Sequence, residues 1–302
     1  EFFHTTREEI GSLTPSITFE EEHSHSTSHR CYIPLDMINN EREIILVDDE
    51  MTTGKTAINI IQSIHAQFPR KEYSVVSILD WRSEENKQQF ALLEKTLGIT
   101  INIVSLLSGR IQVEEIGNLK EQEQPHTYLG IEPSIEEVSL SAFFDDVCSS
   151  INNKTPLIKE TGRFGTDSHD NEVLHKKISA AAAMLRQHRT GTKTLCLGTG
   201  EFMYIPMKLS AEMGSNVFYQ STTRSPIFIQ NIQGYGAKHG IGFPNPEDQD
   251  VDHFVYNIPP GEYEELYVFF EREVPAENLQ PLLEQVAKLQ IKSIKIVFFS
   301  HS

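Results

Sequence analysis

Apolar runs in the first third of the chain alternate with a segment of helical spacing. Ile44–Val47 is a continuous apolar run, which is typical of a strand buried on both faces of a parallel sheet. Residues 56–66 have apolar side chains at the spacing of one helix face, and residues 73–81 and 98–109 predict two further strands. The pattern predicts a parallel strand–loop–helix–strand unit, with its loop at the strand's carboxyl end, where open α/β sheets bind ligands.

A second block of alternating elements follows an acidic, irregular stretch. We expect residues 121–160 to be a linker or hood, with one amphipathic piece at residues 136–151. Residues 172–188 have helical spacing. The elements expected after them are strand Thr194–Leu197, a glycine loop, helix Phe202–Met213 and strand Asn216–Gln220. The predicted fold class is α/β, with a parallel sheet flanked by helices in residues 1–120 and a second, Rossmann-like domain in residues 161–302.

Composition narrows the class of protein. A chain of 302 residues is long enough for two domains, each with its own core. The net charge of −17 argues against sequence-independent nucleic-acid binding, which needs a basic face. Three cysteines without metal-ligand spacing fit a reducing, cytoplasmic compartment, and no run approaches the roughly 18–20 apolar residues of a membrane span. The chain begins at Glu1 and not at methionine, so we expect that residues before it are missing.

The loop after the first strand has the chemistry of a ribose 5-phosphate site. Asp48 and Asp49 end the strand, and Thr52–Thr56 form a turn that opens the helix. The hydroxyls of this turn, and amides at a helix N-terminus, suit a phosphate dianion. Carboxylates beside a phosphate would repel the ligand unless they contact a neutral donor, and ribose hydroxyls are such donors. We therefore expect the carboxylates on the diol and the turn on the phosphate.

Two alternatives compete for the same residues. Gly54-Lys55-Thr56 matches the end of a Walker phosphate loop, but that motif needs glycine where Asp49 stands, so we reject it. An ordinary strand–helix turn with capping threonines is the structural alternative.

The whole stretch closely resembles the phosphoribosyl pyrophosphate (PRPP) motif of type I phosphoribosyltransferases. The resemblance implies that Asp48 and Asp49 bind the ribose hydroxyls and that Thr52–Thr56 hold the 5-phosphate. The implied PRPP-binding set is Asp48, Asp49, Glu50, Met51, Thr52, Thr53, Gly54, Lys55 and Thr56. The resemblance also implies Mg²⁺ bound through PRPP, without a dedicated set of protein ligands, and displacement of pyrophosphate by a base nitrogen. Lys55 stands where many members have a small residue, and we interpret it as an extra phosphate cation.

In that family a mobile loop before the motif closes over the pyrophosphate. Arg7 is the candidate here for stabilising the departing charge, and with Asp48 and Asp49 it completes the predicted catalytic set. Further candidates are His23, His25, His29 and Arg30, for which a solvated polar loop or an adventitious metal site is the alternative. Family members usually also have a strand, a pyrophosphate loop and a helix before the motif, which this sequence lacks. Trp81 is expected in the core, with base stacking as the lesser alternative.

The second half contains another recognisable motif. Thr222–Pro226, with Leu197–Phe202 upstream, resembles the TRSP domain, which follows an orotate phosphoribosyltransferase-like domain in proteins of bacterial tellurite-resistance and stress operons. A second anion site is a candidate at Gly198, Thr199, Gly200 and Arg224. A methyltransferase-like glycine motif lacks the acidic residue it needs at the end of the next strand, and a tight strand–helix turn is the structural alternative.

The two halves share a weak internal repeat. Thr-Thr-Arg occurs at residues 5–7 and 222–224. Phe19 and Tyr32 have the same spacing as Phe243 and Tyr256, which places His29 on His253. In the same comparison Asp48, Asp49 and Glu50 fall on Glu271, Arg272 and Glu273. We hypothesise that the second domain is a diverged copy of the first.

These observations lead to one expected function with two rivals. The expected function is Mg²⁺-dependent transfer of a phosphoribosyl group from PRPP to a small, orotate-like nitrogenous base, with no nucleic-acid or membrane partner and a homodimer as a candidate assembly. The rivals are a non-catalytic PRPP or nucleotide sensor and a cysteine hydrolase that uses Cys31.

Overall fold

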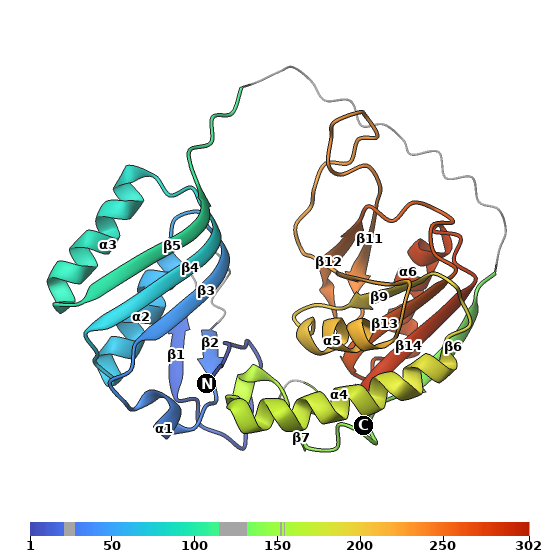
Figure 1. Ribbon diagram of the computed structural model, residues 1–302, viewed down its shortest axis with the longest axis horizontal. Coiled ribbons are helices and arrows are strands. Elements are labelled where there is room, and N and C mark those ends of the chain that lie inside the picture. The colour runs from blue at the N-terminus through green and yellow to red at the C-terminus, as the bar shows by residue number, and fades with distance from the viewer. Residues whose placement is uncertain (21–27, 115–131, 152, 154, 302) are drawn as a thin grey trace. The chain divides into compact units, whose positions relative to one another are not determined.

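The computed structural model describes residues 1–20, 28–114, 132–151, 153 and 155–301. The chain divides into two compact units (Figure 1). Unit 1 consists of Glu1–Gly117 and Thr161–Asp167, and unit 2 consists of Asn118–Glu160 and Ser168–Ser302. Within the described part of the chain, no helix combines the length and apolar character needed to cross a membrane.

Unit 1 contains the predicted parallel strand–helix–strand unit. Its three-stranded sheet has the order β3-β4-β5, and both neighbouring pairs are parallel. The strands and helices of this sheet are β3 (Ile44–Met51), α2 (Lys55–Gln67), β4 (Glu72–Asp80), α3 (Glu84–Leu97) and β5 (Thr100–Ser108). An antiparallel pair and a short helix precede the sheet: β1 (Ile17–Glu20), β2 (Ser28–Cys31) and α1 (Leu35–Ile38). The loop between β3 and α2 therefore lies at the carboxyl edge of the sheet, as predicted.

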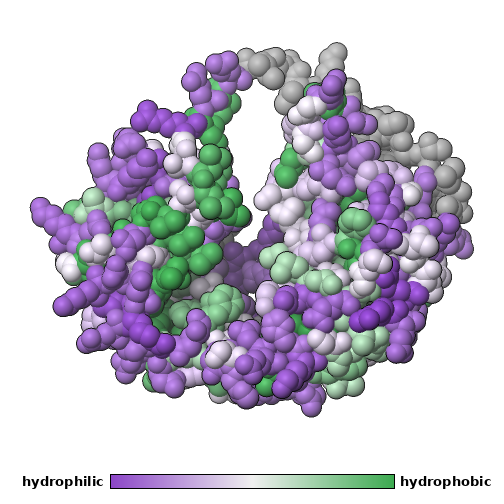
Figure 2. Space-filling model, viewed as in Figure 1, coloured by the Kyte–Doolittle hydropathy of each residue, from purple (hydrophilic) through white to green (hydrophobic). Residues whose placement is uncertain are grey.

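One face of the unit 1 sheet is covered by helices, and among the described residues of unit 1 no helix packs on the other. Side chains of α2 and α3 pack with Tyr73, Val75 and Ile101 in a single core. On the other face Ile45 is 59% exposed and Val47 is 79% exposed. Figure 2 shows the resulting apolar surface over the strands of unit 1. The expectation that β3 is buried on both faces is therefore wrong, because an apolar run predicts a strand but does not specify what covers each face.

Unit 2 has a five-stranded parallel sheet in the order β10-β9-β13-β14-β6. Its strands are β6 (Ser134–Ser139), β9 (Thr194–Gly198), β10 (Val217–Ser221), β13 (Glu265–Arg272) and β14 (Ser293–Ser300). One face packs against α4 (Ser168–His188) and α5 (Tyr204–Glu212). The other packs against α6 (Ala276–Ala287) and the antiparallel hairpin of β11 (Gly240–Asn245) and β12 (Asp248–Tyr256). This sheet is thus covered on both faces, as a Rossmann-like domain requires.

The expected domain boundaries need correction. Residues 121–160 were predicted as a linker or hood, yet β6 pairs with β14 as an edge strand of the unit 2 sheet, and β7 (Val147–Cys148) pairs with β8 (Leu157–Ile158). Conversely, the segment with the 3₁₀ turn η1 (Gly162–Phe164) belongs to unit 1, where Phe2 N donates to Thr166 O at 2.8 Å. β6 escaped prediction because an edge strand with mostly exposed, polar residues has no apolar pattern.

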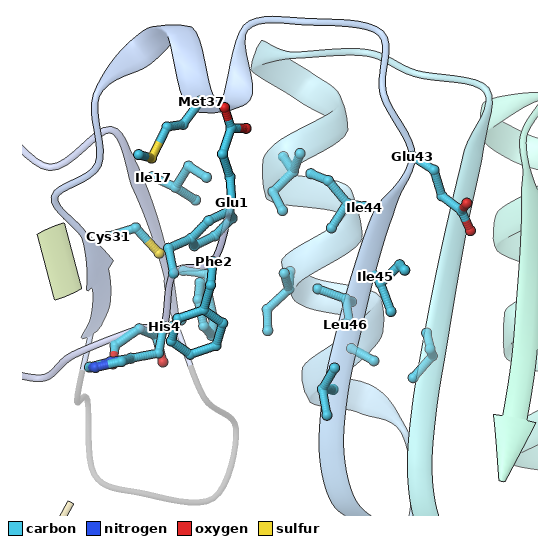
Figure 3. Close-up of a pocket in the computed structure, with 18 of the residues that line it drawn as sticks. Glu1, Phe2, His4, Ile17, Cys31, Met37, Glu43, Ile44, Ile45 and Leu46 are labelled. Atoms are coloured by element: carbon cyan, nitrogen blue, oxygen red, sulfur yellow. The ribbon is translucent and has the colours of Figure 1, made fainter. Parts of the chain in front are cut away.

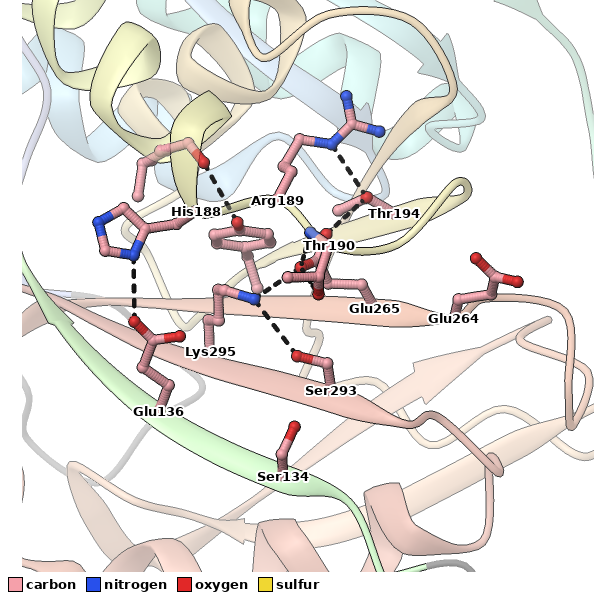
Figure 4. A network of polar contacts seen from close by, with 12 residues as sticks. Ser134, Glu136, His188, Arg189, Thr190, Thr194, Glu264, Glu265, Ser293 and Lys295 are labelled. Carbon is pink, nitrogen blue, oxygen red and sulfur yellow. Dashed lines mark hydrogen bonds and ion pairs between the residues drawn. The ribbon is translucent and has the colours of Figure 1, made fainter.

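A buried ion pair anchors the amino ends of three unit 2 strands (Figure 4). Lys295 Nζ lies 2.6 Å from Glu265 Oε1, and the two residues are 1% and 0% exposed. The same carboxylate accepts hydrogen bonds from Thr190 N at 3.0 Å and from Thr194 Oγ1 at 2.9 Å. Burial alone would raise the pKa of Glu265, but these donors hold it below its ordinary value. The network lies at the edge opposite the carboxyl ends, so we interpret it as a structural anchor.

The internal repeat is partly visible in the topology. In both units a Thr-Thr-Arg segment precedes an antiparallel hairpin and then a parallel strand–helix–strand, which is β3-α2-β4 in unit 1 and β13-α6-β14 in unit 2. The complete strand orders differ, because β5 follows β4 in the chain whereas β6 precedes β14. The similarity between the two units is therefore confined to this shared substructure, and the differing strand orders argue against the second domain as a whole being a copy of the first.

Candidate functional site

The carboxyl end of β3 presents three acidic residues in succession. Asp48, Asp49 and Glu50 are exposed, whereas Met51 after them is 2% exposed. The backbone N–H of Asp49 donates to Asp48 Oδ1 at 3.0 Å, and that of Glu50 donates to Asp49 Oδ1 at 2.9 Å. Partial burial raises the pKa of Asp48, and repulsion from Asp49 and Glu50 adds to this, although the Asp49 N–H opposes it. Hydrogen-bond donors or a cation brought to this strand end would relieve the repulsion.

The turn that follows opens helix α2. Gly54 has φ of +75° at the start of α2. Thr52 Oγ1 donates to Glu50 Oε1 at 3.2 Å, and Lys55 N donates to Thr53 Oγ1 at 3.3 Å. By the geometry of an α-helix, the next two amides in the first turn have no partner within the helix. Such amides, at the positive end of the helix dipole, attract phosphate.

A buried pair beneath the turn fixes the position of Gly54. Arg82 Nε and Nη2 donate to Asp80 Oδ1 and Oδ2 at 2.9 and 2.8 Å, and the side chains are 4% and 6% exposed. The Arg82 guanidinium lies 4.4 Å from the ring centroid of Phe90, and these hydrogen bonds lower the pKa of Asp80. A Cβ on Gly54 would meet this layer, 2.5 Å from the Phe90 ring. The sequence analysis did not predict this ion pair, although Asp80 and Arg82 lie at the carboxyl end of β4, where polar residues of functional sites are often found.

A cavity of about 780 Å³ adjoins the acidic strand end (Figure 3). Two residues of the predicted PRPP-binding set, Asp48 and Thr56, line it. The wall formed by β3 is apolar, and in Figure 3 the N-terminal segment from Glu1 to His4 forms part of the wall across from it. The other seven members of the set do not line the cavity, so the turn lies at its margin and not within it.

Thr5 and His29 bring polar groups to the same cavity. Thr5 Oγ1 lies 3.3 Å from His29 Nδ1, and Arg7 Nε donates to His29 Nε2 at 3.5 Å. Arg7 itself is not among the lining residues, whereas His29, to which it donates, is. This arrangement suits Arg7 as a residue that positions His29.

The structure places the remaining sequence candidates as follows. Arg30 lies on β2 and contacts Glu9 at 3.7 Å. His23 and His25 lie outside the described residues. Trp81 is half-buried and does not line the cavity. Cys31 does line it, but the residue is 2% exposed and burial raises the pKa of its thiol to about 12. A cysteine nucleophile needs a thiolate, so the cysteine-hydrolase rival loses its physical basis.

The second-domain candidates gather at the carboxyl edge of the unit 2 sheet. Gly198 ends β9, and a Cβ there would lie 2.5 Å from the Tyr219 hydroxyl, which is a packing requirement. Thr199 Oγ1 donates to Phe269 O at 2.8 Å, so this hydroxyl is also structural. Gly200 and the exposed Arg224 remain as candidates for binding.

Comparison with known proteins agrees with both resemblances. Residues 1–110 match the family described as phosphoribosyl transferase. Residues 160–286 match the family described as "TRSP domain C terminus to PRTase_2". None of the curated proteins compared with the chain matches it significantly. The first match supports a general phosphoribosyl-transfer function. The two matches together give the chain the arrangement of a phosphoribosyl transferase domain followed by a TRSP domain.

Proposed function

We propose that unit 1 transfers a phosphoribosyl group from PRPP to a small nitrogenous base and releases pyrophosphate. One observation carries the proposal: the acidic end of β3 and the first turn of α2 both contribute to one cavity, through Asp48 and Thr56. Its volume is within the range of small-molecule sites, roughly 300–1,000 Å³. In this arrangement Asp48 and Asp49 accept hydrogen bonds from the two ribose hydroxyls. The amides and hydroxyls of the turn hold the 5-phosphate, with Lys55 as an additional cation.

Binding at this position also explains the acidic cluster. Burial first, and then repulsion from Asp49 and Glu50, raise the pKa of Asp48. Hydroxyl donors and the positive charge that forms on the ribose ring in the transition state would both be stabilised there. These exposed carboxylates are hard oxygen donors, which fits Mg²⁺ delivered with PRPP. When bound, Mg²⁺ supplies charge neutralisation for the departing pyrophosphate.

The apolar wall of the cavity suits a planar base. Phe3, Ile44 and Leu46 line it, and the uncharged face of a base would bury against such side chains. His29, from β2, offers a polar group at the same cavity. We expect an orotate-like base to be the first acceptor to test.

Isothermal titration of the full chain with PRPP and Mg²⁺ tests the proposal. We expect saturable binding that Asp48→Asn with Asp49→Asn abolishes without unfolding unit 1. Asp36→Asn is the matched control, because Asp36 is an exposed aspartate on α1 that does not line the cavity. Absence of PRPP binding by the wild-type chain would end the proposal.

A non-catalytic PRPP or nucleotide sensor is the second candidate. The observation that favours it is the position of Arg7, the candidate for stabilising the leaving group, which is held on His29 and does not line the cavity. Binding of PRPP without release of pyrophosphate, across a panel of bases, would select the sensor.

A further inference from the structure

Two distant parts of the chain build the same hydrogen-bonded module. In unit 1, Thr6 and Arg30 exchange backbone hydrogen bonds, both 2.8 Å long. In unit 2, Thr223 and Phe254 do the same, at 3.0 and 2.7 Å. The Thr-Thr-Arg module is defined here as the segment of residues 5–10 with β1 and β2 in unit 1, and of residues 222–227 with β11 and β12 in unit 2.

A tyrosine at the end of the second strand of each hairpin, directly after β2 in unit 1 and as the last residue of β12 in unit 2, closes the module in the same way. Tyr32 Oη donates to Glu8 O at 3.1 Å and accepts from Ile10 N at 3.0 Å. Tyr256 Oη donates to Ser225 O at 2.7 Å and accepts from Ile227 N at 2.7 Å. Each donor and acceptor occupies the corresponding position of its module. The two modules therefore share the same local fold. Two sheets can have the same strand topology without sharing these tyrosine hydrogen bonds.

Both modules hold a histidine against a threonine. Thr5 Oγ1 lies 3.3 Å from His29 Nδ1, and Thr222 Oγ1 lies 3.0 Å from His253 Nδ1. Each histidine is also the cross-strand neighbour of a phenylalanine. In unit 1 this histidine lines the cavity of the proposed PRPP site, so the module adjoins a ligand site there.

The two histidines differ in the use of their other ring nitrogen. Arg7 Nε donates to His29 Nε2. The equivalent Nε2 of His253 is buried and has no hydrogen-bond partner among the described residues, and the side chain is only 1% exposed. Thr222 Oγ1 accepts from Gly200 N at 3.0 Å and also shares a hydrogen bond with His253 Nδ1. Nε2 of His253 is therefore the ring nitrogen whose hydrogen-bonding capacity is unused among the described residues.

The His253 ring lies against the glycine loop at the carboxyl edge of the sheet. A Cβ on Gly200 would lie 3.8 Å from His253 Cε1 and 3.8 Å from Glu247 Oε2, and Gly200 has φ of +57°. Arg272, at the end of β13, pairs with Glu247 at 3.3 Å and balances its charge. Arg224 is exposed, and its charge helps, after burial, to lower the pKa of His253. Residues that follow or end three parallel strands, β9, β10 and β13, thus lie around His253, as they do in ligand sites of α/β sheets.

We propose that this cluster is a second ligand site, which binds the phosphorylated ribose of a nucleotide. Arg224 contacts the phosphate, and His253 Nε2 forms a hydrogen bond with a ribose hydroxyl. Glu247 accepts from a ribose hydroxyl, and Gly200, which has no side chain, adjoins the sugar. A phosphate alone would meet the Glu247 carboxylate unfavourably, and ribose alone would leave Arg224 without an anion, so the combination fits best.

The test uses the full chain with Asp48→Asn and Asp49→Asn, which removes the proposed unit 1 site. Titration calorimetry with ribose 5-phosphate should show saturable binding. Arg224→Ala should weaken it at least about tenfold, as expected for loss of a charge-assisted hydrogen bond. Arg186→Ala, an exposed arginine of α4, is the matched control and should change nothing. His253→Gln should also weaken binding, and Arg224, being exposed, keeps the test valid if His253→Gln fails to fold.

The outcomes are distinct from those of the unit 1 proposal. No saturable binding of ribose 5-phosphate, or binding that Arg224→Ala leaves intact, overturns the second site. Equal affinity for inorganic phosphate or for unphosphorylated ribose overturns the assigned ligand class. If the wild-type chain fails to bind PRPP while Arg224-dependent binding of ribose 5-phosphate persists, only the unit 1 proposal fails.

Discussion

Replacing Gly54 by alanine tests whether the phosphate turn depends on the layer beneath it. An added Cβ would lie 2.5 Å from Cε2 and 2.7 Å from Cζ of Phe90, and 3.1 Å from Cδ of Arg82. A positive φ costs a residue with a Cβ about 1–2 kcal/mol. Displacing a buried ring in a filled core costs about 1–3 kcal/mol more. We therefore expect Gly54→Ala to lower the free energy of unfolding of unit 1 by about 2–5 kcal/mol.

Gly98→Ala provides the matched control. Gly98 also has a positive φ, +67°, but a Cβ there would meet nothing within 4 Å. Gly98→Ala should therefore lower the free energy of unfolding only by the cost of a positive φ, about 1–2 kcal/mol. The difference between the two variants isolates the steric part. Urea denaturation of the full chain, followed by hydrogen exchange at the amides of β3 and α2, measures both losses, and titration with PRPP measures the effect on binding.

The expected result is a larger loss for Gly54→Ala, accompanied by weaker PRPP binding that Gly98→Ala does not share. Adding Phe90→Leu to Gly54→Ala should reduce the steric part, because the ring that clashes is gone. Equal losses for the two single variants, with PRPP affinity unchanged, would refute the reasoning that the turn is held from below by Phe90 and Arg82.

Three further predictions concern charge and reactivity. Lys295→Met should destabilise unit 2 by about 3–5 kcal/mol, because it leaves a buried carboxylate without its cation. In the wild type the lowered pKa of Glu265 means that the pair's stabilisation is present above the ordinary value of 4.5 and is lost only as pH falls through the lower folded value. In the variant, burial raises that pKa, so the deficit in urea denaturation should shrink between pH 7 and pH 5. PRPP affinity should fall on acidification through the raised pKa of Asp48, at a pH above the ordinary 3.8, and titrations with Asp48→Asn should lose this dependence. Iodoacetamide at pH 8 should not label Cys31 in the folded chain, because its thiol stays protonated; rapid labelling would restore the hydrolase rival.

The parallel units and their motifs were within reach of the sequence. β3, α2 and β4 follow from residues close together in the chain, whose apolar spacing and turn chemistry act locally. The same is true of β9 and α5, which the structure places within two residues of their expected bounds. The spacing of Phe19 and His29 against that of Phe243 and His253 also anticipated a real feature, because both pairs are cross-strand neighbours.

Other properties depended on contacts between segments far apart in the chain. β6 joins β14 across more than a hundred intervening residues, and nothing in its polar sequence indicates that partner. The exposed apolar face of the unit 1 sheet, the position of Arg7 behind His29, and the Arg82–Asp80 layer under Gly54 are likewise tertiary. The sequence by itself determined the strands, helices and turns around the two motifs, such as β3, α2, β4, β9 and α5, since periodicity and turn chemistry involve near neighbours. Only the tertiary structure decided which faces are covered and which side chains share a cavity, because packing and strand pairing bring together residues whose separation in the chain leaves no local pattern.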